Sequence, residues 1–162
     1  MDKANYIYLR LVDKPPRKAL VKRGVAAREY MSYCLEVGCD VWEQLRPLAA
    51  PGEEPVCLWL PDAFRAPGTS VYVQGVERPL EDNRPVPEGL DTILLPAATY
   101  LLFQGMPFAE EDYAQAVHQV QQAMDAYDPA MLGLRWDEES PRVQLEPVGR
   151  RGYMEMRAVK PL

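Results

Sequence analysis

Apolar and polar residues follow two different periods along the chain. In eight segments the apolar residues are continuous or alternate with polar ones, a pattern typical of β-strands. In two longer segments they recur every three or four residues, a pattern typical of amphipathic helices. Strands are predicted over residues 6–12, 18–23, 56–60, 70–77, 92–95, 99–104, 143–147 and 153–159.

The two helices are predicted over residues 27–45 and 110–127. Pro47 ends the first helix. Gly38 lies inside it at a cost of about 1 kcal/mol relative to alanine, which indicates the close approach of another backbone or of a ligand. His118 lies beside the apolar stripe of the second helix, so we expect it at the surface. The stripes are Tyr30, Cys34, Val37, Val41 and Leu45 in the first helix, and Tyr113, Ala116, Val117, Val120, Met124 and Tyr127 in the second.

The same order of elements occurs twice, over residues 6–79 and 90–161. An internal repeat of this kind predicts a single α+β domain over residues 1–162, built from two βαββ halves with a groove between them. Such grooves commonly bind ligands. Residues 78–89, which hold three prolines and three acidic residues, form the predicted linker. The coinciding positions are Pro15 and Pro96, Leu20 and Leu101, Gly24 and Gly105, Val56 and Val143, Leu58 and Leu145, and Tyr72 and Tyr153.

The composition of the chain limits the kinds of partner that the protein is expected to bind. The 162 residues are 48% hydrophobic, enough for one core, and the formal net charge of −6 argues against direct nucleic-acid binding. No apolar run reaches about 18 residues and no secretory signal is visible, so a cytoplasmic protein without a membrane segment is expected. Three cysteines without CxxC spacing and a single histidine argue against a disulfide framework and a metal site. No cofactor is predicted, and a monomer or weak homodimer is expected.

Successive side chains of a strand point to opposite faces of the sheet. We expect the aliphatic set, Val56, Leu58 and Leu60 with Val143 and Leu145, to lie beneath the helices. The opposite set would then face the groove. That set contains Trp59 and its repeat counterpart Glu146, and Tyr72 and Gln74 with their counterparts Tyr153 and Glu155.

The groove set predicts an aromatic box that contains an acid. Aromatic faces attract cations by about 0.5–2 kcal/mol per contact, and a carboxylate supplies the counter-charge. An apolar setting would raise the pKa of Glu146, which suits acid–base chemistry. The structural alternative is that the rings are core and that Glu146 pairs with Arg142 or a backbone donor. Trp42 either covers the groove or seals the first helix to the sheet, and Trp136, in the acidic loop 135–139, could close over a ligand.

Four segments carry a resemblance to a known family: residues 33–43, 58–61, 69–77, and 144–149 with 152–155. They resemble the GyrI-like small-molecule-binding family, also called the AraC effector-binding or Rob C-terminal type. The resemblance implies a duplicated SH2-like or split-barrel fold with an antiparallel sheet, two long helices and a central groove for lipophilic, often cationic ligands. Many relatives carry a helix-turn-helix ahead of this domain, but only five residues precede the first predicted strand, so a stand-alone form is expected. The candidate ligand-binding residues are Tyr33, Trp42, Trp59, Tyr72, Gln74, Gln104, Trp136, Glu146, Tyr153 and Glu155.

Three functions follow from these patterns. The first is the binding of hydrophobic, cationic or planar aromatic small molecules. The second is the hydrolysis of cyclopropane-bearing DNA-alkylating compounds, with Glu146 as the base, Tyr72 or Tyr153 as the hydroxyl donor and Trp59 stacked on the substrate. The third is interaction with a topoisomerase, which only the namesake of the family suggests.

Overall fold

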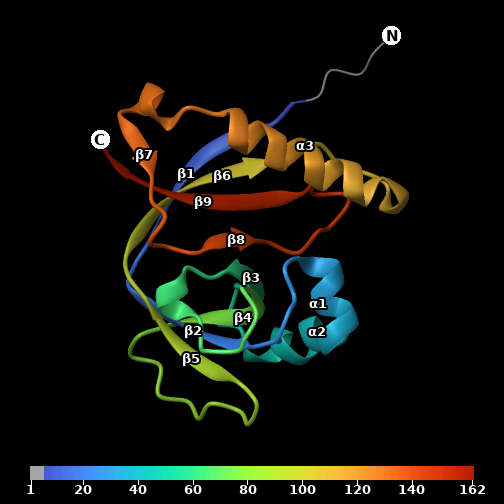
Figure 1. Cartoon of the computed structure of the whole chain (residues 1–162), viewed down its shortest axis with the longest axis vertical. Helices are drawn as coiled ribbons and strands as arrows, with labels where there is room; N and C mark the ends of the chain where they lie inside the picture. The colour runs from blue at the N-terminus through green and yellow to red at the C-terminus, as the bar shows by residue number, and fades with distance from the viewer. Residues whose placement is uncertain (1–5) are drawn as a thin grey trace.

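The computed structural model describes residues 6–162, which form one antiparallel sheet and three α-helices (Figure 1). The helices are α1 (Tyr30–Val37), α2 (Val41–Leu45) and α3 (Tyr113–Ala126). Short 3₁₀ turns are η1 (Arg46–Leu48), η2 (Asp62–Phe64), η3 (Glu110–Asp112) and η4 (Pro129–Leu132). The strands are β1 (Tyr8–Lys14), β2 (Arg17–Lys22), β3 (Val56–Trp59), β4 (Tyr72–Pro79), β5 (Asp91–Leu95), β6 (Ala98–Gln104), β7 (Leu134–Trp136), β8 (Arg142–Gln144) and β9 (Met154–Pro161).

The strand order is β1-β6-β9-β8-β3-β4-β2-β5, with β7 paired to β9. The order reads the same from both ends when each strand of the first half is exchanged for its counterpart in the second: β1 for β5, β2 for β6, β3 for β8 and β4 for β9. The first strand of each half pairs with the other half, β1 with β6 and β5 with β2, so the halves are interlocked. A duplicated chain would give this order.

The sheet curls so that its two ends approach each other. β1 and β2 are joined by only Pro15 and Pro16, yet six strand-to-strand steps separate them in the sheet. A flat sheet would hold them about 29 Å apart, whereas so short a connection reaches only about 10 Å. The curled sheet therefore has an enclosed inner face. Its core is Ala19, Val21, Val56, Leu58, Leu60, Val73, Ile93, Leu95, Tyr100, Leu102, Val143, Met154, Met156 and Ala158.

The helices cover the opposite, outer face. α1 and α2 pack with Tyr72 and Cys57, and α3 packs with Phe103 and Tyr153 (Figure 1). The predicted division of side chains between two faces is correct, but the prediction that the aliphatic set lies beneath the helices is wrong. Because the sheet curls, its aliphatic face is buried against itself and needs no helix. The helices cover the face that carries the aromatic and polar side chains.

The first predicted helix is broken at Gly38. This residue has φ 131°, a value that L residues rarely adopt, and it separates α1 from α2. The break also brings Cys39 back over α1, where it forms a disulfide with Cys34 at a Cα–Cα distance of 4.5 Å. In a continuous helix two residues five positions apart would point about 140° away from each other. The expectation of one long first helix and that of no disulfide are therefore both wrong.

Two other segments differ from the sequence prediction. Residues 134–136 form β7 on the edge of β9, where the sequence indicated part of an acidic loop. Arg78 belongs to β4 rather than to the linker, and its buried guanidinium donates two hydrogen bonds of 3.1 Å to the carbonyl of Leu48. An arginine in a proline-rich stretch resembles a linker residue because the sequence does not show its buried acceptor.

The helix α3 is the longest in residues 6–162, and none of the helices there is long and apolar enough to cross a membrane. His118 is exposed on α3, as predicted.

We expect Gly38→Ala to destabilise the protein by about 2–3 kcal/mol, because an added Cβ would strain the backbone and lie 2.7 Å from Oδ1 of Asp40. Gly52→Ala is the control: it has a φ of 79° but open space around it, and should cost only about 1 kcal/mol. Urea unfolding of both variants measures the difference. Equal losses would show that neither the rarer dihedral angle of Gly38 nor its contact with Asp40 adds to the cost.

Candidate ligand-binding cleft

A cleft lies between the N-terminal ends of α1 and α3. Each helix begins with a tyrosine, Tyr30 or Tyr113, and the two ring centroids are 6.1 Å apart. Phe108 packs on Tyr113 at 6.3 Å. The cleft has a volume of about 540 Å³. Its lining residues are Tyr30, Met31, Phe108, Glu110, Tyr113, Pro147 and Gly149.

The residues just before Tyr30 and Tyr113 determine where each helix begins and so position both tyrosines. Glu29 caps α1 by accepting hydrogen bonds from the backbone N–H groups of Met31 and Ser32, at 2.8 and 2.6 Å. Partial burial opposes ionisation of Glu29, but these hydrogen bonds outweigh it and lower its pKa. The acidic turn η3, which precedes Tyr113, suits the positive end of the α3 dipole. Glu110, the first residue of η3, is exposed and lines the cleft.

Gln144 links the cleft to the interior. It is buried in β8, its side chain interacts with the hydroxyl of Tyr113, and its Oε1 accepts a hydrogen bond of 2.8 Å from the hydroxyl of Tyr72. The Tyr72 ring in turn packs edge-on against Trp59 and Tyr33, with ring centroids 5.2 and 5.5 Å apart. Burial raises the pKa of Tyr113 to about 12, so its hydroxyl remains neutral at physiological pH.

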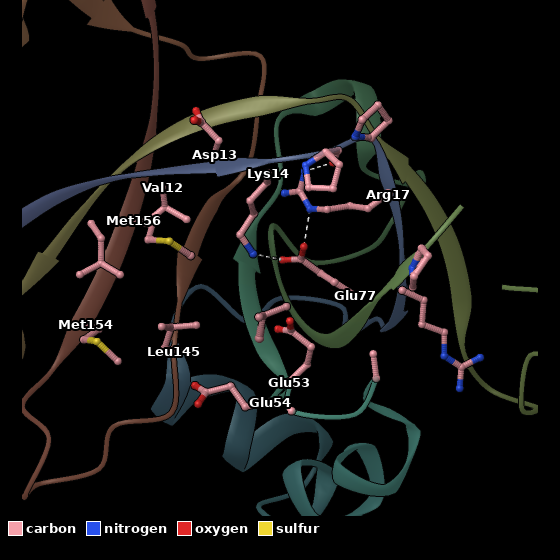
Figure 2. Close-up of a pocket in the computed structure, with 18 of the residues that line it drawn as sticks. Val12, Asp13, Lys14, Arg17, Glu53, Glu54, Glu77, Leu145, Met154 and Met156 are labelled. Atoms are coloured by element: carbon pink, nitrogen blue, oxygen red, sulfur yellow. Dashed lines mark hydrogen bonds and ion pairs between the residues drawn. The ribbon is translucent and has the colours of Figure 1, made fainter. Parts of the chain in front are cut away.

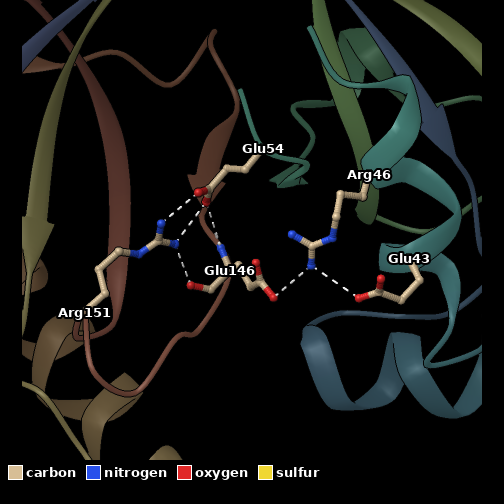
Figure 3. A network of polar contacts seen from close by, with 5 residues as sticks. All are labelled: Glu43, Arg46, Glu54, Glu146 and Arg151. Carbon is tan, nitrogen blue, oxygen red and sulfur yellow. Dashed lines mark hydrogen bonds and ion pairs between the residues drawn. The ribbon is translucent and has the colours of Figure 1, made fainter. Parts of the chain in front are cut away.

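Glu146 lies at the rim rather than inside an aromatic box. It forms an ion pair of 3.2 Å with Arg46, which also contacts Glu43 (Figure 3). On the other side of this segment, which follows β8, Arg151 forms a two-pronged ion pair with Glu54, at 2.7 and 3.0 Å, and donates to the carbonyl of Glu146 at 2.8 Å. Glu146 is thus paired, as the structural alternative predicted, but its partner is Arg46 rather than Arg142.

The fully buried acid of the outer face is Glu155, on β9. It accepts hydrogen bonds from the hydroxyl of Tyr153 at 2.6 Å and from Gln121 at 2.9 Å, and forms an ion pair of 2.6 Å with Arg142. Burial, and then the negative charge of Glu155, raise the pKa of Tyr153 well above its ordinary value. Tyr153 therefore remains a neutral donor to the carboxylate.

Trp59 and Arg142 face each other across β3 and β8, where the two halves meet. The guanidinium carbon of Arg142 is 5.8 Å from the Trp59 ring centroid, within range of a cation–π interaction. The indole N–H of Trp59 donates a hydrogen bond of 2.8 Å to the carbonyl of Arg28, just before α1. This hydrogen bond links the middle of the sheet to the start of the helix that carries Tyr30.

The remaining candidate residues lie elsewhere. Tyr33 is buried and donates to the carbonyl of Lys22 at 2.7 Å, and Gln104 donates to the carbonyl of Arg151 at 2.7 Å. Trp42 packs in the core beneath α2, and its buried indole N–H has no hydrogen-bond partner within residues 6–162. Gln74 is buried in β4.

Trp136 lies on β7, not in an exposed loop. It packs near Phe103, and the guanidinium of Arg157 is 4.4 Å from its ring centroid. The predicted box is therefore split: Trp59 and Tyr72 lie together, while Tyr153 and Glu155 lie beneath α3. Whether any of these residues binds a ligand stays a prediction, as does the hydrolase alternative.

The sequence interpretation missed the residues that line the cleft. Tyr30 and Tyr113 were assigned to apolar helix stripes, as their spacing indicates. A usable signal was present: in both halves the stripe begins with a tyrosine, a residue with a polar end, at the first turn of the helix. No group of three His, Cys, Asp or Glu side chains within the described residues could hold a metal ion.

Comparison with solved structures identifies the fold. The chain is similar to SAV2435, solved bound to tetraphenylphosphonium, with a TM-score of 0.61 and 15% identity over 94% of both chains. It is also similar to a protein from Staphylococcus aureus MU50 described as a bacterial transcription regulation protein, with a TM-score of 0.57 and 14% identity over 94% of this chain and 98% of the other. The C-terminal domain of EcmrR matches with a TM-score of 0.51 and 13% identity over 96% and 99%.

These similarities are consistent with the fold of a GyrI-like effector-binding domain and confirm the resemblance at the level of the fold. No protein-family model matches the chain, and no curated protein matches it significantly.

We expect Arg142→Met to destabilise the protein by about 3 kcal/mol at pH 7, because it leaves the buried carboxylate of Glu155 without its counter-charge.

Arg157→Met is the control: its partner Glu138 is largely exposed, and with the loss of its contact with Trp136 it should cost about 1 kcal/mol. Thermal unfolding of both variants at pH 7 measures the loss of stability. Equal losses of stability in the two variants would contradict the assigned role of Arg142 as the counter-charge of Glu155.

Proposed function

We propose that the protein binds lipophilic, cationic, planar or aromatic small molecules in the cleft between α1 and α3. The observation that carries this proposal is the pair of tyrosine rings, Tyr30 and Tyr113, that line one cavity with the acidic side chain of Glu110. Rings provide apolar surface and attract cations through their faces. The carboxylate provides the opposite charge at the entrance.

The electrostatics of the surroundings favour a cation. Arg142, on the strand that carries Gln144, is neutralised by Glu155, so it adds little repulsion. Glu146 and Glu43 share the single charge of Arg46, so this group of three keeps a net negative charge. Burial is the main cause of the raised pKa of the Tyr30 hydroxyl, and the charge of Glu146 also contributes to it. A ligand between the tyrosines would thus meet the carboxylates of Glu110 and Glu146, both from the second half of the chain.

The size of the cleft also suits this class of ligand. A volume of about 540 Å³ is within the range of sites for drug-sized molecules, about 300–1,000 Å³. Structural similarity to SAV2435, which was solved with tetraphenylphosphonium, supports the choice of a lipophilic cation as the first probe.

Calorimetric titration of the protein with tetraphenylphosphonium tests the proposal. Tyr113→Ala should weaken binding about tenfold or more, because it removes one wall of the cleft. Glu110→Gln should weaken binding about three- to tenfold for the cation, but leave a neutral analogue, triphenylphosphine oxide, within about twofold of wild type.

Glu111→Gln is the matched control, because Glu111 is the next residue, is equally exposed and does not line the cleft. It should change the affinity by less than about twofold. Affinities for the cation that are unaffected by both Tyr113→Ala and Glu110→Gln would reject this cleft as the binding site.

A further inference from the structure

A second, larger cavity opens on the inner face of the sheet, away from the helices. It has a volume of about 730 Å³ and lies between β1, β6 and β9 on one side and β4 on the other (Figure 2). Its apolar wall is formed by side chains that alternate with those of the outer face. They are Val12, Val56, Leu102, Leu145, Met154 and Met156.

One end of this cavity has an excess of positive charge. Lys14 and Arg17 share a single carboxylate, that of Glu77 (Figure 2). The distance from Nζ of Lys14 to Oε1 of Glu77 is 3.0 Å. Arg17 is buried, and it also donates hydrogen bonds to the carbonyls of Pro96 and Pro15 and to the hydroxyl of Tyr100, at 3.1, 3.4 and 3.2 Å. Within residues 6–162, Glu77 is the only hydrogen-bond acceptor of Lys14. An ammonium has three N–H donors, so Lys14 can donate to a further anion.

The opposite end of the cavity is electrically balanced. There Glu54 and Arg151 neutralise each other through two hydrogen bonds. The other acids that line the cavity, Asp13, Glu53 and Glu81, are exposed, so water screens their charge. Of the two remaining cations, Arg10 is exposed and Arg78 donates to the carbonyl of Leu48. The uncompensated charge within the cavity is therefore at Lys14 and Arg17.

We propose that this inner cavity is a second binding site, for an alkyl carboxylic acid. The carboxylate accepts hydrogen bonds from Lys14, and the alkyl chain lies along Leu145, Met154 and Met156. Methionine side chains adapt to flexible apolar ligands, which suits an alkyl chain better than a rigid planar one. The ligand differs in both charge and shape from the one proposed for the cleft.

The two sites lie on opposite faces of one sheet. Leu145 lines the inner cavity, while its neighbours Gln144 and Glu146 point to the outer face. The acid and the lipophilic cation should therefore bind at the same time. This proposal does not depend on the function proposed for the cleft.

Calorimetric titration with dodecanoic acid, below its micelle concentration, tests the inner site. We expect one molecule to bind per chain, about tenfold more tightly than dodecan-1-ol or dodecyltrimethylammonium, because a charge-assisted hydrogen bond is lost with either. Lys14→Met, which keeps the apolar stem, should remove this preference by weakening the acid about tenfold and leaving the alcohol within about twofold. Arg17 still pairs with Glu77 in this variant, so the fold is retained.

Two further variants sharpen the test. Lys22→Met is the matched control: Lys22 lies on β2 outside the cavity, and its loss should change the affinity by less than about twofold. Leu145→Trp fills the cavity and should weaken the binding of both the acid and the alcohol about tenfold. This variant tests the site even if Lys14→Met is unstable.

Three outcomes would overturn the proposal. One is equal affinity for the acid and the alkylammonium; another is unchanged acid binding in Leu145→Trp. The third is displacement of the acid by tetraphenylphosphonium with loss of acid binding in Tyr113→Ala, which would place the acid in the cleft. Failure of the cation to bind would reject only the function proposed for the cleft.

Discussion

Only two residues join β1 to β2, and only two join β5 to β6, although each pair is six strands apart in the sheet. This connectivity constrains the rest of the structure. The sheet must curl until its ends meet, and the inner face then buries its aliphatic side chains against one another. Arg17 of β2 reaches Tyr100 of β6 across this enclosure, which holds the two ends together. The outer face is left for the helices.

The curl also explains why the protein has two different cavities. On the outer face, α1–α2 and α3 cover separate halves of the sheet, and their first turns meet at Tyr30 and Tyr113. On the inner face, aliphatic and methionine side chains fill most of the enclosure and leave space near Lys14 and Glu77. The chemistry of each cavity follows from strand alternation, which sends aromatic and polar residues outward and aliphatic residues inward.

Ion pairs between distant segments determine which charges remain available. Glu155 and Arg142 neutralise each other, as do Glu54 and Arg151. A pair with a buried member, such as Glu155 with Arg142, contributes little net stability, but losing the partner is costly because the buried charge is left uncompensated. Their effect on function is to remove charge from positions where the sequence alone suggests a reactive group. Within residues 6–162, the carboxylate that lines the cleft without an ion-pair partner is Glu110, in an acidic turn that looks like an ordinary solvated surface.

Local periodicity determined most of the secondary structure and the division of each strand into two faces. Residues that coincide in the two halves take corresponding places: Val56 and Val143 are inner, and Tyr72 and Tyr153 are outer. The sequence could not show which face the helices cover, because alternation is the same whether a sheet is flat or curled. It also could not show the backbone dihedral of Gly38, the partner of each charge or the meeting of Tyr30 with Tyr113. Those features depend on contacts between residues far apart in the chain, and only the tertiary structure brings them together.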